Sequence, residues 1–179
     1  MRWYSVLLVI DEEEFWSLVK PLGRYPGDGD FDRLTARLAT RPEAEITGFA
    51  DRLAQLLWML DTPAHLAAAR TARADVFLYV RCAVVAAGHK AYDRVLHKPS
   101  ALETYAEEDA ELLLTVAEQA YEQATSLLWE HETPFSYETG SNVAAWGETD
   151  PELVPAQSDS PPIWLDLSYR TGPVRSLRR

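Results

Sequence analysis

Residues 75–89 read DVFLYVRCAVVAAGH, an apolar stretch with one arginine, Arg81, near its centre. Its length and composition predict a helix buried in the core of the protein. A charge among apolar residues is costly unless it is paired, so Arg81 is expected to meet a carboxylate, a cluster of backbone carbonyls or a ligand. The stretch therefore predicts a helical core with one special polar position inside it.

Length and composition predict a single globular domain. The chain has 179 residues, of which 47% are hydrophobic, and a chain of this length buries roughly two thirds of the surface of its unfolded form. The expected fold class is mainly α, a single-domain helical bundle of about five to seven helices with an irregular C-terminal tail. We assign residues 1–10 to a strand-like extension, 11–131 to a helical domain and 132–179 to an aromatic, proline-rich tail packed on the same domain.

Charge and cysteine content exclude several classes of protein. The net charge of −11 repels phosphate backbones, so no nucleic-acid partner is expected. No apolar run approaches the roughly 18 residues that cross a bilayer, so the protein is not expected in a membrane. The single cysteine, Cys82, excludes an internal disulfide and suits a reducing, cytoplasmic location.

Apolar spacing and capping residues predict where the helices lie. The first should begin at Asp11, and the others should cover residues 31–39, 42–61, 75–89, 91–96 and 107–130. We interpret the turn at residues 25–30 as a linker, because it lacks the closing glutamate of a calcium loop. The inner side of the last helix is expected to include Leu127 and Leu128.

The two ends of the chain have strand-like sequences. Residues 1–10 are rich in β-branched and aromatic side chains, and residues 163–169 alternate apolar with polar ones. They are expected to pair in a small two-stranded sheet. An unpaired edge of such a strand would permit a homodimer.

Arg81 is the centre of the predicted site. Asp51 and Asp61, on the helix predicted over residues 42–61, are candidate partners for its charge, and the sequence does not choose between them. The pair would either fix the packing of the core or form part of a ligand site.

The helix predicted over residues 75–89 carries other polar side chains on the face next to that of Arg81. Helical spacing places Asp75, Tyr79 and His89 on a strip beside that of Arg81. An arginine fork, a tyrosine hydroxyl and a titratable histidine could together hold an anionic group. His89 is equally well explained as a residue that complements the dipole at the end of the helix.

The segment at residues 133–146, TPFSYETGSNVAAW, is aromatic and rich in turn residues, without a clear period. Tyr137, Asn142 and Trp146 are candidate binding residues within it. The segment either lines a pocket or packs as irregular structure over the helices.

Several motifs carry a resemblance to a known family. They are Phe15-Trp16, FLYVR at residues 77–81, AGHKAY at 87–92 and KPSAL at 98–102. Over about residues 11–129 the chain resembles the bacterial domain of unknown function 4240 family, and residues 134–146 are similar to the tail of an actinobacterial branch of it. The resemblance implies no settled activity. It implies site roles for Asp75, Tyr79 and Arg81, although Ala74 replaces the first acid of the usual acidic pair.

Two functions from different classes remain. The first is a cytoplasmic binding or regulatory protein that recognises a peptide or protein partner through a groove near Arg81 and the aromatic tail. The alternative is a small enzyme or biosynthetic accessory factor that holds an anionic substrate with Arg81 and moves a proton with Asp75 or His89. Histidines at ligand spacing and phosphate or dinucleotide loops are missing, so neither a metal nor a cofactor is expected.

Overall fold

The computed structural model describes residues 10–147 of the chain. Its elements, in chain order, are α1 (Glu12–Val19), α2 (Asp28–Leu38), α3 (Glu43–Met59), α4 (Pro63–Ala69), α5 (Ala74–Ala86), α6 (His89–His97), the 3-10 helices η1 (Pro99–Tyr105) and η2 (Glu111–Thr115), α7 (Val116–Thr125) and α8 (Val143–Trp146). The mainly helical fold class is confirmed. No strand occurs within residues 10–147, and the predicted sheet between residues 1–10 and 163–169 falls almost wholly outside them.

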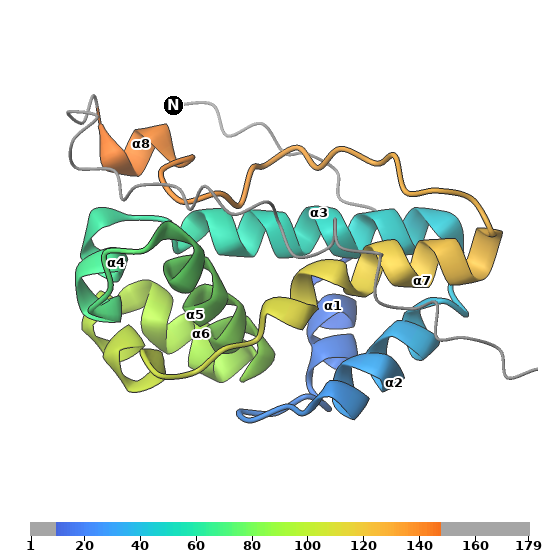
Figure 1. Ribbon diagram of the computed structural model, residues 1–179, viewed down its shortest axis with the longest axis horizontal. Coiled ribbons are helices and arrows are strands. Elements are labelled where there is room, and N and C mark those ends of the chain that lie inside the picture. Colours follow the sequence, from blue (N-terminus) through green and yellow to red (C-terminus); the bar gives the residue numbers. More distant parts are fainter. Residues whose placement is uncertain (1–9, 148–179) are drawn as a thin grey trace, which may run out of the picture.

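The longest helix, α3, runs horizontally in Figure 1, with the other long helices largely on one side of it. The elements α4, α5 and α6 gather around one end of it, whereas α1, α2 and α7 lie toward the other. Pro42 precedes its first turn, and an apolar stripe that includes Ile46, Leu53 and Leu57 is buried along its length. A helix whose apolar stripe is continuous over four turns can pack against neighbours at both ends.

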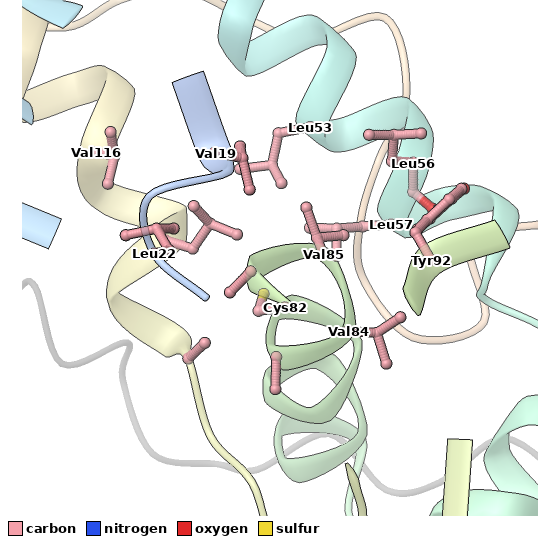
Figure 2. Packing of buried hydrophobic residues seen from close by; sticks show 14 of the residues in the cluster. Val19, Leu22, Leu53, Leu56, Leu57, Cys82, Val84, Val85, Tyr92 and Val116 are labelled. Atoms are coloured by element: carbon pink, nitrogen blue, oxygen red, sulfur yellow. The ribbon is translucent and has the colours of Figure 1, made fainter. Parts of the chain in front are cut away.

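The core lies where α1, α3 and α5 meet (Figure 2). Val19 of α1 and Leu53 of α3 face the end of α5, where Val85 lies beside Leu57 of α3. All four are at most 4% exposed. Asp11 starts α1 as predicted, because its Oδ1 accepts a hydrogen bond from the Glu14 amide at 2.7 Å.

The helices predicted over residues 75–89 and 91–96 correspond to α5 and α6, but the break between them lies earlier than predicted. The first, α5, ends at Ala86, and Gly88 then adopts φ 95° and ψ 173° before α6 begins at His89. This backbone conformation is accessible to glycine and strongly unfavourable for other residues. The predicted end of the first helix at His89 was therefore three residues too late, because Gly88 turns the chain and His89 already belongs to α6.

The start of α2 also differs from the prediction. Asp28 and Asp30, which were interpreted as part of a linker, belong to the first turn of this helix. Asp30 accepts a hydrogen bond from the backbone amide of Gly27 at 2.9 Å, and both acids lie at the positive end of the helix dipole. The helix α4 was not predicted, although Thr62 caps it and Pro63 occupies its first turn.

The last long helix is much shorter than predicted. It begins as the 3-10 helix η2, continues as α7 and ends at Ser126, whose φ of 60° is left-handed. Leu127 and Leu128, which were expected on the inner side, are 60% and 78% exposed. The expected burial of these two residues was therefore wrong, because the chain leaves the helical path before it reaches them.

Candidate functional site

An extended segment, residues 129–142, follows α7 and is called the strap here. Between Trp129 and Thr139 its side chains alternate in burial, with every second residue turned toward the domain. The inward side chains are Trp129, His131, Thr133, Phe135, Tyr137 and Thr139. This period of two is typical of an extended chain lying with one face on a surface.

The strap runs along α3 in the same direction as the helix (Figure 1). His131 contacts Asp51 near the middle of α3, with 2.7 Å between its Nε2 and the carboxylate oxygen. Further along, the ring of Phe135 lies 5.2 Å from that of Trp58. These contacts place the next part of the strap over the end of α3, where α5 also approaches.

Arg81 of α5 holds both the helix and the strap by hydrogen bonds. Its Nη1 donates to the backbone oxygen of Leu57 in α3 at 2.9 Å, and its Nη2 donates to the backbone oxygen of Tyr137 at 3.0 Å. The same Nη2 lies 3.1 Å from the hydroxyl of Thr139, which in turn donates to the Ala74 backbone oxygen. Arg81 is fully buried. The sequence predicted a carboxylate, a cluster of backbone carbonyls or a ligand as the partner of Arg81, and the structure shows backbone carbonyls.

The environment of the Arg81 charge is otherwise apolar. The guanidinium lies 4.6 Å from the centre of the Phe77 ring, and its Nε has no hydrogen-bond partner among the described residues. Burial lowers the pKa of Arg81, while the negative charge of Asp61 acts in the opposite direction. No ion pair within 4 Å joins Arg81 to a carboxylate of residues 10–147.

Asp61, just beyond α3, is also fully buried and bonds the next residues of the strap. Its two carboxylate oxygens accept hydrogen bonds from the amides of Gly140 and Asn142, at 3.1 and 3.0 Å. The hydroxyl of Ser141 lies 3.4 Å from the same carboxylate. Its closer partner is the Ser136 backbone oxygen, at 2.7 Å, so the two backbone amides are the donors that stabilise the Asp61 charge away from water.

The strap lines an open pocket of about 360 Å³ with both inward and outward residues. All of its lining residues belong to the strap: Glu132, Thr133, Phe135, Ser136, Tyr137 and Glu138. Glu132 and Glu138 are exposed, and within the described part of the chain neither forms an ion pair. The pocket therefore combines aromatic residues with two free carboxylates.

The comparison with protein families identifies the domain. Residues 10–123 match the model of the family described as protein of unknown function, DUF4240. The chain belongs to the DUF4240 family. No curated protein and no solved structure matches this DUF4240 protein. The match covers α1 to α6, η1, η2 and most of α7, and it ends before the strap.

In this DUF4240 protein the predicted site residues of α5 and α6 do not converge on one site. Asp75 lies in the first turn of α5, where it pairs with Arg73. His89 begins α6 beyond the opposite end of α5, stacks on Trp16 and contacts Glu12 at 3.2 Å. The two groups predicted to move a proton are thus separated by the full length of the helix.

Tyr79 and the tail residues have different surroundings. Tyr79 is half-buried, and its pKa is raised chiefly by burial, with a smaller contribution from Glu111. Asn142 caps α8 by accepting from the Ala145 amide, and its side-chain amide donates to the Trp58 backbone oxygen at 3.0 Å. Trp146 is buried in α8. Tyr137 contributes its backbone oxygen, rather than its hydroxyl, to Arg81.

Both candidate partners of Arg81 therefore have other primary partners. Asp51 contacts His131, and Asp61 bonds the strap amides. Sequence reasoning did not find Thr139, nor Glu132 and Glu138 on the outer face. The alternation of aromatic and polar residues from Trp129 to Tyr137 was the available signal, and Pro134 partly conceals it.

Residues 10–147 contain no cluster of three or more histidine, cysteine or acidic side chains that could hold a metal ion. Over the same residues, every helix is too short or too polar to span a bilayer.

Proposed function

We propose that this DUF4240 protein is a cytoplasmic binding protein that recognises an extended, basic peptide segment of a partner protein. The segment would lie along the outer side of the strap, in the pocket formed by residues 132–138. The observation that carries the proposal is this open pocket of about 360 Å³ on a segment that buried charges hold in place from behind. The single buried thiol, Cys82, supports the cytoplasmic setting.

Backbone chemistry of the strap favours an extended partner. Within the described part of the chain, the amides of residues 129–133 and 135–137 have no hydrogen-bond partner. An extended segment with free amides and alternating side chains can accept another extended chain beside it. Main-chain bonds would supply affinity, and the pocket would select side chains.

Charge favours a basic partner. Glu132 and Glu138 flank the pocket, Glu130 is exposed just before it, and the whole chain carries a net charge of −11. Lysine or arginine side chains in the pocket would meet free carboxylates, and the negative field would speed their association.

Arg81 and Asp61 support the same proposal by fixing the strap before any partner arrives. They bond the backbone at Tyr137, Gly140 and Asn142, so the outer face keeps one conformation. A preorganised surface loses less conformational entropy on binding than a loop that must first become ordered.

The alternative, an enzyme that holds an anionic substrate with Arg81, gains no support from the geometry. Arg81 is fully buried beneath the strap, and both Asp75 and His89 are engaged elsewhere. A substrate would have to displace Tyr137 and Thr139 to reach the guanidinium.

Fluorescence polarisation with defined peptides tests the proposal. The probe is a labelled peptide in which lysine alternates with valine or threonine, and the comparison peptide carries glutamate in place of lysine. We expect the basic peptide alone to bind, and the double variant Glu132→Gln/Glu138→Gln to weaken it by about tenfold, because two charge-assisted contacts are lost.

Two controls separate this site from general attraction to an acidic protein. Glu107→Gln/Glu122→Gln removes the same charge from exposed positions outside the pocket and should leave binding almost unchanged. A basic peptide methylated on the alternate backbone nitrogens that face the strap should bind poorly, because the methyl groups keep its carbonyl oxygens away from the strap amides. Equal binding by both double variants, or by the methylated peptide, would refute the proposal.

A further inference from the structure

The connection between α7 and the strap is short and has an unfavourable conformation. Ser126 ends α7 with φ 60° and ψ 20°, a left-handed conformation that L-residues other than glycine and asparagine rarely adopt. Its amide still bonds the Glu122 backbone oxygen at 2.9 Å, so the helix is regular up to this point. The change of direction is therefore concentrated at one residue.

Leu127 and Leu128 follow this turn and are 60% and 78% exposed. In sequence they continue the inner stripe of the helix, which runs through Leu113, Val116 and Ala120 at spacings of three and four residues. The local sequence thus favours a helix that extends past Ser126, whereas the docked strap requires the helix to stop there.

Most of the strap could form its contacts with another copy of the domain. Trp129 lies beside Tyr121 of α7, but beyond it the strap contacts α3, α5 and the turn after α3, through Asp51, Arg81 and Asp61. None of these contacts requires that strap and domain belong to the same chain.

We propose that two copies of this chain exchange their straps. In the dimer, α7 continues as a helix through residues 126–128, and the strap crosses to the partner, where its Tyr137 carbonyl and Thr139 hydroxyl bond the other copy's Arg81. Leu127 and Leu128 of the two chains then pack together near the two-fold axis. The partner copy completes each Arg81 site. Two changes favour the exchange: Ser126 leaves its left-handed conformation, and Leu127 and Leu128 become buried.

This inference does not depend on peptide binding. All residues that line the pocket at 132–138 belong to the strap, so the pocket is the same whether or not the straps are exchanged. The peptide-binding assay and the assembly assay can therefore fail separately.

The first test measures mass by light scattering coupled to gel filtration, with full-length protein over a range of concentrations. We expect a monomer and dimer in equilibrium. Ser126→Gly permits the left-handed turn and should weaken the dimer by about tenfold or more, whereas Ser126→Ala should strengthen it. Leu127→Ser/Leu128→Ser should weaken the dimer without altering the monomer fold, because both residues are exposed there.

A cross-linking experiment shows whether the straps are exchanged. Asp51→Cys/His131→Cys places two thiols at the contact between α3 and the strap, and Cys82 is buried. A short bis-maleimide applied to the isolated dimer should join the two chains covalently, whereas in the isolated monomer it should join residues within one chain. Cross-links only within chains in the dimer fraction, or a purely monomeric Ser126→Ala variant at the highest soluble concentration, would overturn the proposal.

Discussion

Asp61 and Arg81 are both fully buried and opposite in charge, yet they bond the same segment of chain rather than each other. Arg81 donates to the Tyr137 backbone oxygen at 3.0 Å, and Asp61 accepts from the amides of Gly140 and Asn142. The cation, Arg81, thus bonds a carbonyl of the strap, and the anion, Asp61, bonds two strap amides a few residues further along the chain. Their charges still compensate one another in the interior, because the negative charge of Asp61 favours the protonated form of Arg81.

Replacing Arg81 should cost much more stability than replacing an exposed arginine. Arg81→Met keeps most of the volume but removes three hydrogen bonds and leaves Asp61 without a nearby cation. We expect a loss of about 3–5 kcal/mol in the free energy of unfolding. Arg73→Met, which removes an arginine that is largely exposed and paired with Asp75, should cost at most about 1 kcal/mol. Urea denaturation followed by tryptophan fluorescence measures both, and equal losses would contradict this role for Arg81.

Two glycine substitutions should change stability in opposite directions. Gly88 has φ 95°, and a Cβ there would meet no atom within 4 Å, so Gly88→Ala tests backbone strain alone. We expect a loss of about 1–3 kcal/mol. Gly29 lies inside α2, where a Cβ would meet only the flexible Arg33 side chain, and Gly29→Ala should gain about 0.5–1 kcal/mol. Thermal unfolding compares the two, and a neutral Gly88→Ala would disprove the strain at the corner between α5 and α6.

His65 should make the folded state less stable as the pH falls. Its imidazole lies between the Thr62 hydroxyl and the Val95 backbone oxygen, and burial lowers its pKa below the ordinary 6.5. Below about pH 6.5 His65 is protonated in the unfolded chain but stays neutral in the folded one. The free energy of unfolding therefore decreases as the pH falls, until the pH reaches the pKa of His65 in the folded protein. Above that range the histidine contributes no pH dependence.

The measurement is the free energy of unfolding of the wild type and His65→Gln between pH 5 and 8. Exposed carboxylates contribute to both proteins, so the difference between the two curves isolates His65. We expect this difference to change below about pH 6.5 and to be flat above it. Parallel curves over the whole range would exclude the proposed effect.

Cys82 should not react with thiol reagents in the folded protein. It is completely buried in α5, and burial raises the pKa of its thiol to about 12, so almost no thiolate exists near neutral pH. Labelling with a chromogenic disulfide at pH 8 should proceed only as fast as the protein unfolds, and it should become rapid in urea. Immediate labelling of the folded protein would show that α5 opens locally.

The sequence predicted most helices because their apolar spacing is local information. Asp11 marks the start of α1, and the stripe of α3 is visible from Ile46 to Leu57. The break between α5 and α6 was predicted, but the end of α5 was placed at His89 rather than at Ala86. A glycine can end a helix or be tolerated within one, and periodicity alone does not decide between them.

The end of α7 and the partners of Arg81 could not be predicted for a different reason. The helical pattern continues through Leu128, whereas α7 stops at Ser126 and the strap that follows contacts α3. The bond from Arg81 to Tyr137 joins residues 56 apart, and it uses a backbone oxygen that every residue possesses. Nothing in the sequence distinguishes that oxygen from its neighbours, so the need of Arg81 for a partner was predictable and the identity of the partner was not.

Arg81 and Asp61 bond main-chain atoms of the strap, and this affects how such proteins can diverge. Arg81 and Asp61 bond one carbonyl and two amides of the strap, and these atoms survive almost any substitution there. Selection acting on this closure would therefore fall on Arg81 and Asp61, both inside the matched range 10–123, and on Thr139 of the strap, and it would constrain the side chains at the other bonded positions less. Related chains could close over the same two residues with segments that share no recognisable sequence, and only their three-dimensional structures would reveal the common ancestry of that closure.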